Sequence, residues 1–296
     1  MQQAGSSSPS CSSTSDCFPL SNRNTAECGS ETSTEAVKHE VRANNTPTEP
    51  SRMSSVLRFY VCYLLCLGLG LACIVCVCVW NSQWRGGFAW DSSSLQFNWH
   101  PVLMVTGLVV LYGIGAVVYR IPLTWGQNKL PWKLLHAALM FIALILSIVG
   151  LCAVFDFHNA KNTPNLYSLH SWIGIAATAL FAIQWVVGLA GFLLPWSPVS
   201  LRALLKPIHV WMGGSILWLS IVACISGINE KLFFVLKGAQ PYASLPPEAV
   251  LGNLLGVLIV AFGLVALKIL SNHEWQRPDG SSQDLAYTPL LQEENE

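Results

Sequence analysis

The chain has 296 residues, of which 52% are hydrophobic and only 11% are charged, and its formal net charge is zero. Soluble domains carry about 25% charged residues, so this composition predicts a protein that crosses a membrane several times. A zero net charge gives no electrostatic footprint for nucleic acid. Five of the ten cysteines lie in one apolar segment, and no loop expected outside the cytosol contains one, so we expect no disulfide framework.

The chain begins with a polar stretch, residues 1–52, that has no apolar run and predicts a disordered tail. Six apolar stretches follow, and each is long enough to cross a hydrocarbon core of about 30 Å as a helix. They cover residues 57–80, 98–119, 132–155, 168–194, 208–228 and 249–270, with Pro131 and Pro207 introducing the third and fifth. We predict an all-α membrane protein with six transmembrane helices over residues 53–275 and a second tail over residues 276–296.

Lysine and arginine are unequally divided between the two sides of the predicted bundle. The side with both termini carries nine, Arg52, Arg58, Arg120, Lys129, Lys133, Arg202, Lys206, Lys268 and Arg277, and the other carries four, Arg85, Lys161, Lys231 and Lys237. Because cytosolic loops are rich in Lys and Arg, we expect both termini in the cytosol. No Asp, Glu or Arg lies deep within a span, which disfavours a proton-coupled pump or carrier.

The second to the fifth apolar segments each carry one histidine near their start, namely His100, His136, His170 and His209. Consecutive spans run in opposite directions, so His100 is expected beside His170 near one surface, and His136 beside His209 near the other. An imidazole in hydrocarbon is costly and marks a pathway, a relay or a ligand. Two stacked histidine pairs in a four-helix core, built by spans two to five, are the arrangement that holds two six-coordinate haems.

Haem held in this way would exchange electrons, because two axial histidines leave no open position for oxygen. The sequence has no C-x-x-C-H motif, which excludes covalent c-type attachment. The two pairs are predicted on the order of 20 Å apart across the bilayer core. A lone histidine of this kind is more simply explained as a hydrogen bond to a neighbouring helix, but four at matching depths on alternating faces favour ligation.

Other polar residues near these pairs have two interpretations. His158 lies between spans three and four on the side of the His100 and His170 pair, where it is either a metal contact together with Asp156 or an ordinary loop histidine. The basic residues beside the other pair either hold propionates and attract a small anionic reductant, or reflect only the cytosolic charge bias. Those basic residues are Arg120, Lys129, Lys133, Arg202 and Lys206.

The segments around the four histidines resemble the cytochrome b561 family of transmembrane ascorbate-dependent oxidoreductases, and the resemblance extends over residues 55–278. The motifs are Phe97-Asn98-Trp99-His100-Pro101-Val102-Leu103-Met104, Leu135-His136-Ala137, Asn165-Leu166-Tyr167-Ser168-Leu169-His170-Ser171-Trp172, Lys206-Pro207-Ile208-His209-Val210 and Gly227-Ile228-Asn229-Glu230-Lys231-Leu232. Segments 84–90 and 130–133 are most similar to a lysosomal, ferric-reducing branch of that family.

The resemblance implies two haem b groups per chain and a role for particular residues. His100 and His170 would be the axial ligands of a lumenal haem, and His136 and His209 those of a cytosolic haem. The cytosolic haem would also contact Arg120 and Lys129, and ascorbate would contact Lys129, Lys133 and Arg202. The lumenal haem would contact Asn165, Leu166, Tyr167, Ser168 and Glu230, and lumenal ferric iron would contact His158 and Glu248. Gln276 stands where relatives often have a lysine, so no haem contact is carried over to it.

From these residues and the resemblance we expect transmembrane electron transfer from cytosolic ascorbate through two haems to lumenal ferric iron. One alternative keeps the haems but regenerates ascorbate from monodehydroascorbate inside vesicles. Another is a non-catalytic haem-binding scaffold in the membrane. The resemblance also suggests a homodimer. A tyrosine-based signal for sorting adaptors is matched by Tyr287-Thr288-Pro289-Leu290. This motif and the resemblance together predict a multi-pass protein of late endosomes and lysosomes.

Overall fold

A computed structural model describes residues 49–278 of the chain. The bundle belongs to a compact unit that begins at Met53. The predicted disordered tail lies almost entirely outside the described residues, and the sorting signal at Tyr287 to Leu290 lies wholly outside them.

The bundle contains six helices that are long and apolar enough to cross a membrane. They cover Met53–Trp84, Ser94–Arg120, Lys129–Ala160, Leu169–Leu193, Val199–Val235 and Pro247–Ser271. Between residues 49 and 278 the structure has no β-strand. The predicted all-α architecture with six spans is therefore confirmed, and most spans extend several residues beyond the apolar stretches because helix continues into the interface.

The first, third, fifth and sixth spans are continuous α-helices, and the second and fourth contain π-helical segments. The continuous helices are α2 (Glu49–Trp84), α6 (Lys129–Ala160), α8 (Val199–Val235) and α9 (Pro247–Ser271). The second span joins α3 (Ser94–Phe97), α4 (Trp99–Met104), the π-helix η1 (Val105–Leu111), α5 (Tyr112–Val117) and the 3-10 helix η2 (Val118–Arg120). The fourth span joins α7 (Leu169–Gly188) and the π-helix η4 (Leu189–Leu193). Three short 3-10 helices, η3 (Pro122–Thr124), η5 (Tyr242–Ser244) and η6 (His273–Trp275), lie outside the spans.

Local sequence explains where two of these helices begin, and the structure corrects a third. The Asn128 side chain accepts a hydrogen bond from the N–H of Leu130 and caps α6, while Ser168 and Ser171 form a capping box at the start of α7. The prediction that Pro207 introduces the fifth span is wrong, because α8 begins at Val199 and contains Pro207. The helix continues through the proline, which lacks only one backbone donor.

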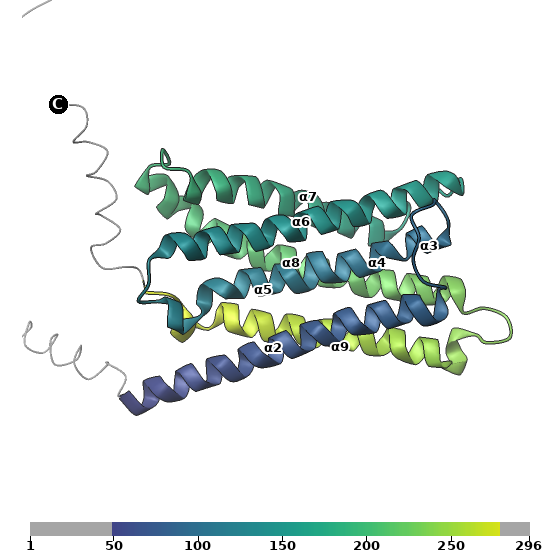
Figure 1. Ribbon diagram of the computed structural model, residues 1–296, viewed down its shortest axis with the longest axis horizontal. Coiled ribbons are helices and arrows are strands. Elements are labelled where there is room, and N and C mark those ends of the chain that lie inside the picture. Colours follow the sequence, from purple (N-terminus) through teal and green to yellow (C-terminus); the bar gives the residue numbers. More distant parts are fainter. Residues whose placement is uncertain (1–48, 279–296) are drawn as a thin grey trace, which may run out of the picture. The chain divides into compact units, whose positions relative to one another are not determined.

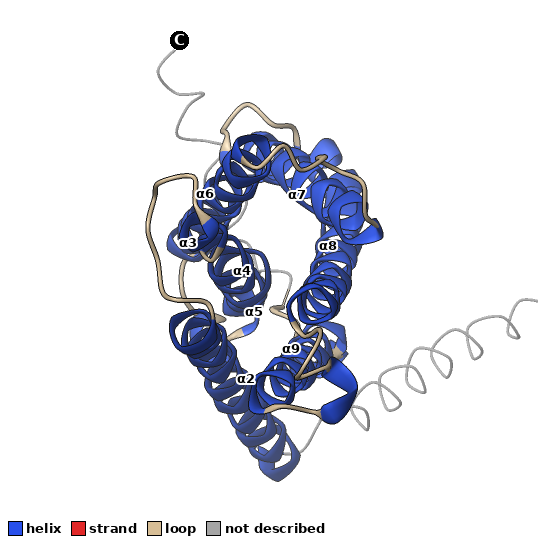
Figure 2. Ribbon diagram, turned by 90° about the vertical axis from the view of Figure 1, so that its right-hand side faces the viewer, coloured by secondary structure: helices blue, strands red, loops and turns tan. Residues whose placement is uncertain are grey.

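Figures 1 and 2 show how the spans are arranged. The second span, α6, α7 and α8 form a ring of four helices. On one side of the ring α9 packs against α8 and α5, and α2 lies beside α9. We call the side where α2 begins and α9 ends the terminal side, and the opposite one the far side. The predicted four-helix core of spans two to five is this ring.

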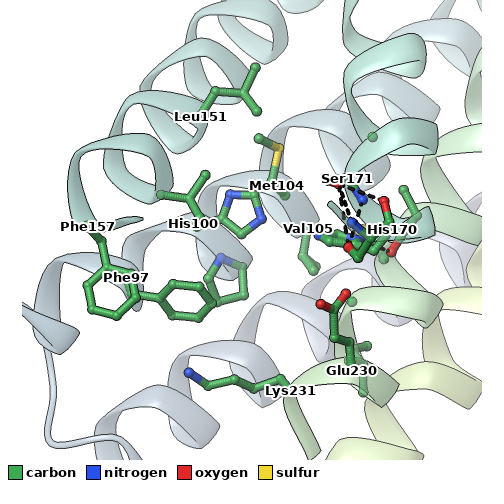
Figure 3. A pocket seen from close by; sticks show the side chains of 18 of the residues that line it. Phe97, His100, Met104, Val105, Leu151, Phe157, His170, Ser171, Glu230 and Lys231 are labelled. Atoms are coloured by element: carbon green, nitrogen blue, oxygen red, sulfur yellow. Dashed lines mark hydrogen bonds between the residues drawn. The ribbon is translucent and has the colours of Figure 1, made fainter. Parts of the chain in front are cut away.

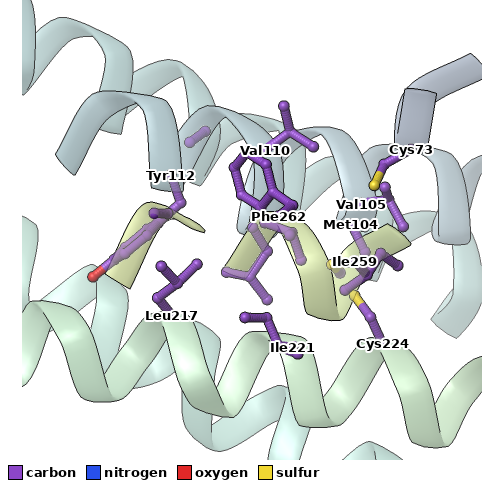
Figure 4. Close-up of a cluster of buried hydrophobic side chains, with 14 of the residues drawn as sticks. Cys73, Met104, Val105, Val110, Tyr112, Leu217, Ile221, Cys224, Ile259 and Phe262 are labelled. Atoms are coloured by element: carbon purple, nitrogen blue, oxygen red, sulfur yellow. The ribbon is translucent and has the colours of Figure 1, made fainter. Parts of the chain in front are cut away.

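The apolar core lies where the second span, α8 and α9 meet (Figure 4). Tyr112, Leu217, Ile221 and Phe262 are completely or almost completely buried there. Tyr112 also donates a hydrogen bond to the carbonyl of Gly213, at 2.9 Å, which satisfies its hydroxyl inside the bundle. This packing fixes α9 against the second span and α8, two of the four helices of the ring.

Candidate functional site

The far side of the ring brings His100 of α4 and His170 of α7 together (Figure 3). Their ring centroids are 6.0 Å apart, and the rings are inclined at 81° to each other. The Nδ1 atom of His100 lies 3.1 Å from the carbonyl oxygen of Gly150, and that of His170 lies 2.8 Å from the carbonyl oxygen of Ala223. Because a carbonyl only accepts, Nδ1 carries the proton in both rings and Nε2 keeps a lone pair for a ligand.

The terminal side of the ring brings His136 of α6 and His209 of α8 together in a similar way. Their ring centroids are 6.2 Å apart, at an angle of 72°. His136 Nδ1 lies 2.7 Å from the carbonyl oxygen of Gly115. His209 differs, because its buried Nδ1 has no hydrogen-bond partner within residues 49–278, and its ring contacts the ring of Phe192 at 5.2 Å.

Both pairs have the spacing that a metal held between two imidazoles requires. With metal–nitrogen bonds of about 2 Å, two rings on opposite sides of one ion have centres about 6 Å apart. Gly227 of α8 lies against the His170 ring, where a Cβ atom would come within 2.7 Å of Cε1. Gly188 of α7 lies against the His209 ring, where a Cβ atom would come within 3.0 Å of Cε1. Each histidine of the α7 and α8 hairpin thus packs against a glycine of the other helix, and this close approach sets the position of its ring.

A cavity of about 380 Å³ adjoins the far pair. Its wall is mostly apolar and includes Met104, Val105 and Leu108, the last two from the π-helix η1. This volume lies within the usual range for small-molecule and cofactor sites. The histidine spacing, the free Nε2 atoms and the apolar wall together fit a haem on this side.

The segment that precedes α7 closes one end of this cavity. Leu166, Tyr167 and Ser168 line it, as predicted from the resemblance, whereas Asn165 donates to Asn159 and lies 3.1 Å from His158 Nδ1. Leu166 adopts a left-handed conformation, with φ of 55°, which is uncommon for a bulky residue. Its carbonyl accepts a hydrogen bond from the indole of Trp172, at 2.8 Å, which stabilises the turn.

Two residues from α8 reach the same cavity with opposite charges, Glu230 and Lys231. Burial and the neighbouring Glu230 carboxylate raise the pKa of the Tyr167 phenol, so Tyr167 stays protonated and donates a hydrogen bond to Glu230. The Lys231 ammonium lies 3.9 Å from the centre of the Phe97 ring, a cation–π contact. The resemblance implies a site role for Glu230 but not for Lys231, which the sequence analysis places only among the four basic residues of the side away from the termini.

Glu248, the predicted iron contact on α9, is buried beside this cavity and already has two donors. Its carboxylate accepts hydrogen bonds from Trp80 Nε1, at 2.8 Å, and from Arg85, at 2.5 Å. His158 lines the cavity. In the part of the chain that the structure describes, no three His, Cys, Asp or Glu side chains gather as a metal cluster. The Glu248 carboxylate can be buried because it forms an ion pair with Arg85.

On the terminal side, the predicted basic residues do not all gather at the histidine pair. Lys133 donates to the carbonyl of Phe192, at 3.5 Å, and Arg202 donates to the carbonyl of Leu194, at 3.1 Å. Both therefore gather at the end of η4, next to the Phe192 ring that contacts His209. Lys129 is the first residue of α6. Arg120 is directed elsewhere: it donates to the carbonyls of Leu270 and Asn272, at 2.6 and 3.4 Å, and so completes the last turn of α9.

Comparison with known proteins identifies the class to which this four-helix ring belongs. The family described as eukaryotic cytochrome b561 matches residues 99–235, the stretch that contains all four histidines. The chain belongs to this cytochrome b561 family, whose members are haem-containing membrane proteins.

Within the family, the chain is similar to proteins with more specific names. It is 65% identical to the lysosomal membrane ascorbate-dependent ferrireductase of Danio rerio over 242 residues, which cover 80% of this chain and 98% of the relative. It is 59% identical to the protein of the same name from Homo sapiens over 223 residues, covering 75% of this chain and 92% of the relative. A plasma membrane ascorbate-dependent reductase of Xenopus laevis is 47% identical over 224 residues, covering 76% of this chain and 78% of the relative.

Proposed function

We propose that this protein transfers electrons across a membrane from cytosolic ascorbate to lumenal ferric iron. The observation that carries the proposal is the presence of two histidine pairs, with ring centroids 6.0 and 6.2 Å apart, at opposite ends of one helical ring. The names of the similar proteins from Danio rerio and Homo sapiens supply the donor and the acceptor.

In this proposal two haem b groups occupy the two pairs, and when bound they supply one-electron exchange near each surface. His100 and His170 would hold the far haem through Nε2, while the carbonyls of Gly150 and Ala223 accept hydrogen bonds from their Nδ1 atoms. His136 and His209 would hold the terminal haem. Leu166, Tyr167, Ser168 and Glu230, which line the far cavity, would surround this haem and limit the access of water to it, and Asn165 stays a predicted contact.

The terminal side faces the cytosol in this proposal, as the excess of Lys and Arg there predicts. Lys133 and Arg202 then attract the ascorbate anion to the end of η4, beside His209, with Lys129 as a third basic contact. Arg120 and Lys129 stay predicted contacts of the terminal haem. On the opposite face, His158 positions ferric iron, and Glu248 stays a predicted second contact.

The names of the relatives support a location in the membrane of late endosomes and lysosomes. The excess of Lys and Arg on the terminal side supports the prediction that both termini lie in the cytosol. A homodimer and the recruitment of sorting adaptors through Tyr287 to Leu290 complete the proposal.

The test is a visible spectrum of the purified protein before and after ascorbate is added, with haem counted per chain. We expect two b-type haems, both reduced by ascorbate, and reduction of ferric iron when the protein is reconstituted in vesicles. Haem that ascorbate does not reduce would favour the scaffold. Reduction of the ascorbate radical without reduction of ferric iron would favour the alternative acceptor.

A further inference from the structure

The far cavity has three charged residues in its wall, Arg85, Glu230 and Lys231. The charge of Arg85 is balanced, because its guanidinium contacts the buried carboxylate of Glu248 at 2.5 Å. Glu230 accepts a hydrogen bond from the Tyr167 phenol and has no cation in salt-bridge contact within residues 49–278. Lys231 forms no salt bridge within residues 49–278. The two unbalanced charges of the wall are therefore adjacent in sequence and opposite in sign.

Lys231 is connected to an axial histidine by a short series of ring contacts. Its ammonium lies 3.9 Å from the centre of the Phe97 ring, and the Phe97 ring lies 6.0 Å from that of His100, centre to centre. Phe157 packs against the other side of Phe97 at 5.3 Å and holds that ring in place. Figure 3 shows Phe97, His100 and Phe157 together on one side of the cavity, with Glu230 and Lys231 on the neighbouring helix.

A fixed charge in a water-poor wall acts on any electron that enters the site. Charges interact more strongly in a medium of low dielectric constant, and a nearby cation favours the reduced state, whereas a nearby anion opposes it. Lys231 and Glu230 must then act in opposite directions on the same redox centre.

We propose that Lys231 is a positioning residue that raises the reduction potential of the far haem, against the opposing charge of Glu230. This inference depends on the proposed haem at His100 and His170. In this inference the Phe97 ring holds the Lys231 ammonium in the cavity wall through their cation–π contact. The balanced pair of Arg85 and Glu248 has a structural role and contributes little to the potential.

The test is a potentiometric titration of the purified protein, with the absorbance of the haems followed as a function of potential. The far haem is identified as the component that is missing in His170→Ala. We expect Lys231→Gln to lower the midpoint potential of this component and Glu230→Gln to raise it, while the other component stays unchanged. Lys231→Arg, which restores the charge, returns the potential toward that of the unaltered protein.

Lys237→Gln is the matched control, because it removes one positive charge just beyond the same end of α8 without changing the cavity wall. Lys237 contacts the Phe234 ring at 5.6 Å and does not line the cavity. An unchanged far-haem potential in Lys231→Gln, or shifts of the same sign in Lys231→Gln and Glu230→Gln, would overturn the inference. If Lys231→Gln does not retain the haem, Glu230→Gln decides alone, and a potential that does not rise overturns the proposal. Absence of ascorbate-reducible haem from the unaltered protein would instead contradict the proposed function.

Discussion

The two histidine pairs have almost the same ring spacing but different surroundings. On the far side, His100 and His170 both have a backbone acceptor for Nδ1, and the nearby charges of both signs belong to the cavity wall. On the terminal side, His209 Nδ1 has no partner within residues 49–278, and the nearby charges that we predicted are all basic. The same pair of imidazoles thus lies beside charges of both signs at one end and beside predicted basic residues at the other.

The spacing of the two rings and the residues around them therefore determine separate properties of each pair. The spacing of the rings determines what each pair can ligate. The charges around each pair determine what approaches that end of the bundle and how readily the site accepts an electron. The variants below change one end while leaving the other intact.

Loss of one histidine from each pair should have the largest effect. His136→Ala should abolish reduction of both haems by ascorbate supplied on the terminal side of vesicles, because the entry site is lost. His170→Ala should keep ascorbate reduction of the terminal haem and lose transfer to ferric iron on the far side. Spectra of reconstituted vesicles with ascorbate, and then with dithionite, measure both effects. His273→Ala, in the short helix η6, is the control. Full reduction of both haems in His136→Ala would contradict the assignment.

Substitution of the glycines that contact the histidine rings should have the second-largest effect. A Cβ atom at Gly227 would lie 2.7 Å from His170 Cε1, which requires a shift of the ring or of the helix, so Gly227→Ala should lose most of the far haem. Gly188→Ala is less crowded, at 3.0 Å from His209 Cε1, and should lose only part of the terminal haem. Haem per chain, measured by absorbance, compares the two. Gly68→Ala, where a Cβ atom meets nothing within 4 Å, should bind both haems. Equal losses in the two variants would show that the contacts do not set the ring positions.

Removal of one positive charge from the terminal side should weaken the binding of ascorbate without changing the haems. Lys133→Gln should raise the KM for ascorbate about 10-fold, the effect of one charge-assisted contact worth about 1.5 kcal/mol, with the spectrum unchanged. Initial rates of haem reduction at several ascorbate concentrations measure this. Lys161→Gln removes a positive charge from the exposed far side and should leave the KM unchanged. A KM that responds equally to both variants would mean that net charge alone is responsible.

The smallest effects concern two buried tryptophans, one at each end. Trp80 donates to the Glu248 carboxylate at 2.8 Å, whereas Trp275 donates to uncharged oxygens of Ser55 at 3.2 Å. Hydrogen bonds to charged groups contribute about 1.5–3 kcal/mol and neutral ones about 1 kcal/mol, so Trp80→Phe should destabilise more than Trp275→Phe. Thermal unfolding of both variants in detergent, each against the unaltered protein, tests the order. A larger loss for Trp275→Phe would contradict the role of the buried carboxylate.

Several features follow from the order of residues along the chain alone. Six apolar stretches predict six spans because a helix must be about 20 residues long to cross the core. The alternation of helix direction then predicts which histidines meet, and the structure places His100 beside His170 and His136 beside His209. These inferences succeed because they depend on length, direction and hydrophobicity, which are local properties of the sequence.

Other features depend on how closely distant segments approach each other, which no local pattern contains. Lys231 lies over Phe97, and Glu248 pairs with Arg85, across helices that are far apart in sequence. Arg120 is directed to the end of α9 rather than to the terminal pair. The sequence does not predict that α8 continues through Pro207, because Arg202 and Lys206 interrupt the apolar pattern of its first turns and a proline usually marks a helix boundary. Tertiary packing decides these positions, since a buried charge or an open helix end is stable only where another segment supplies its partner.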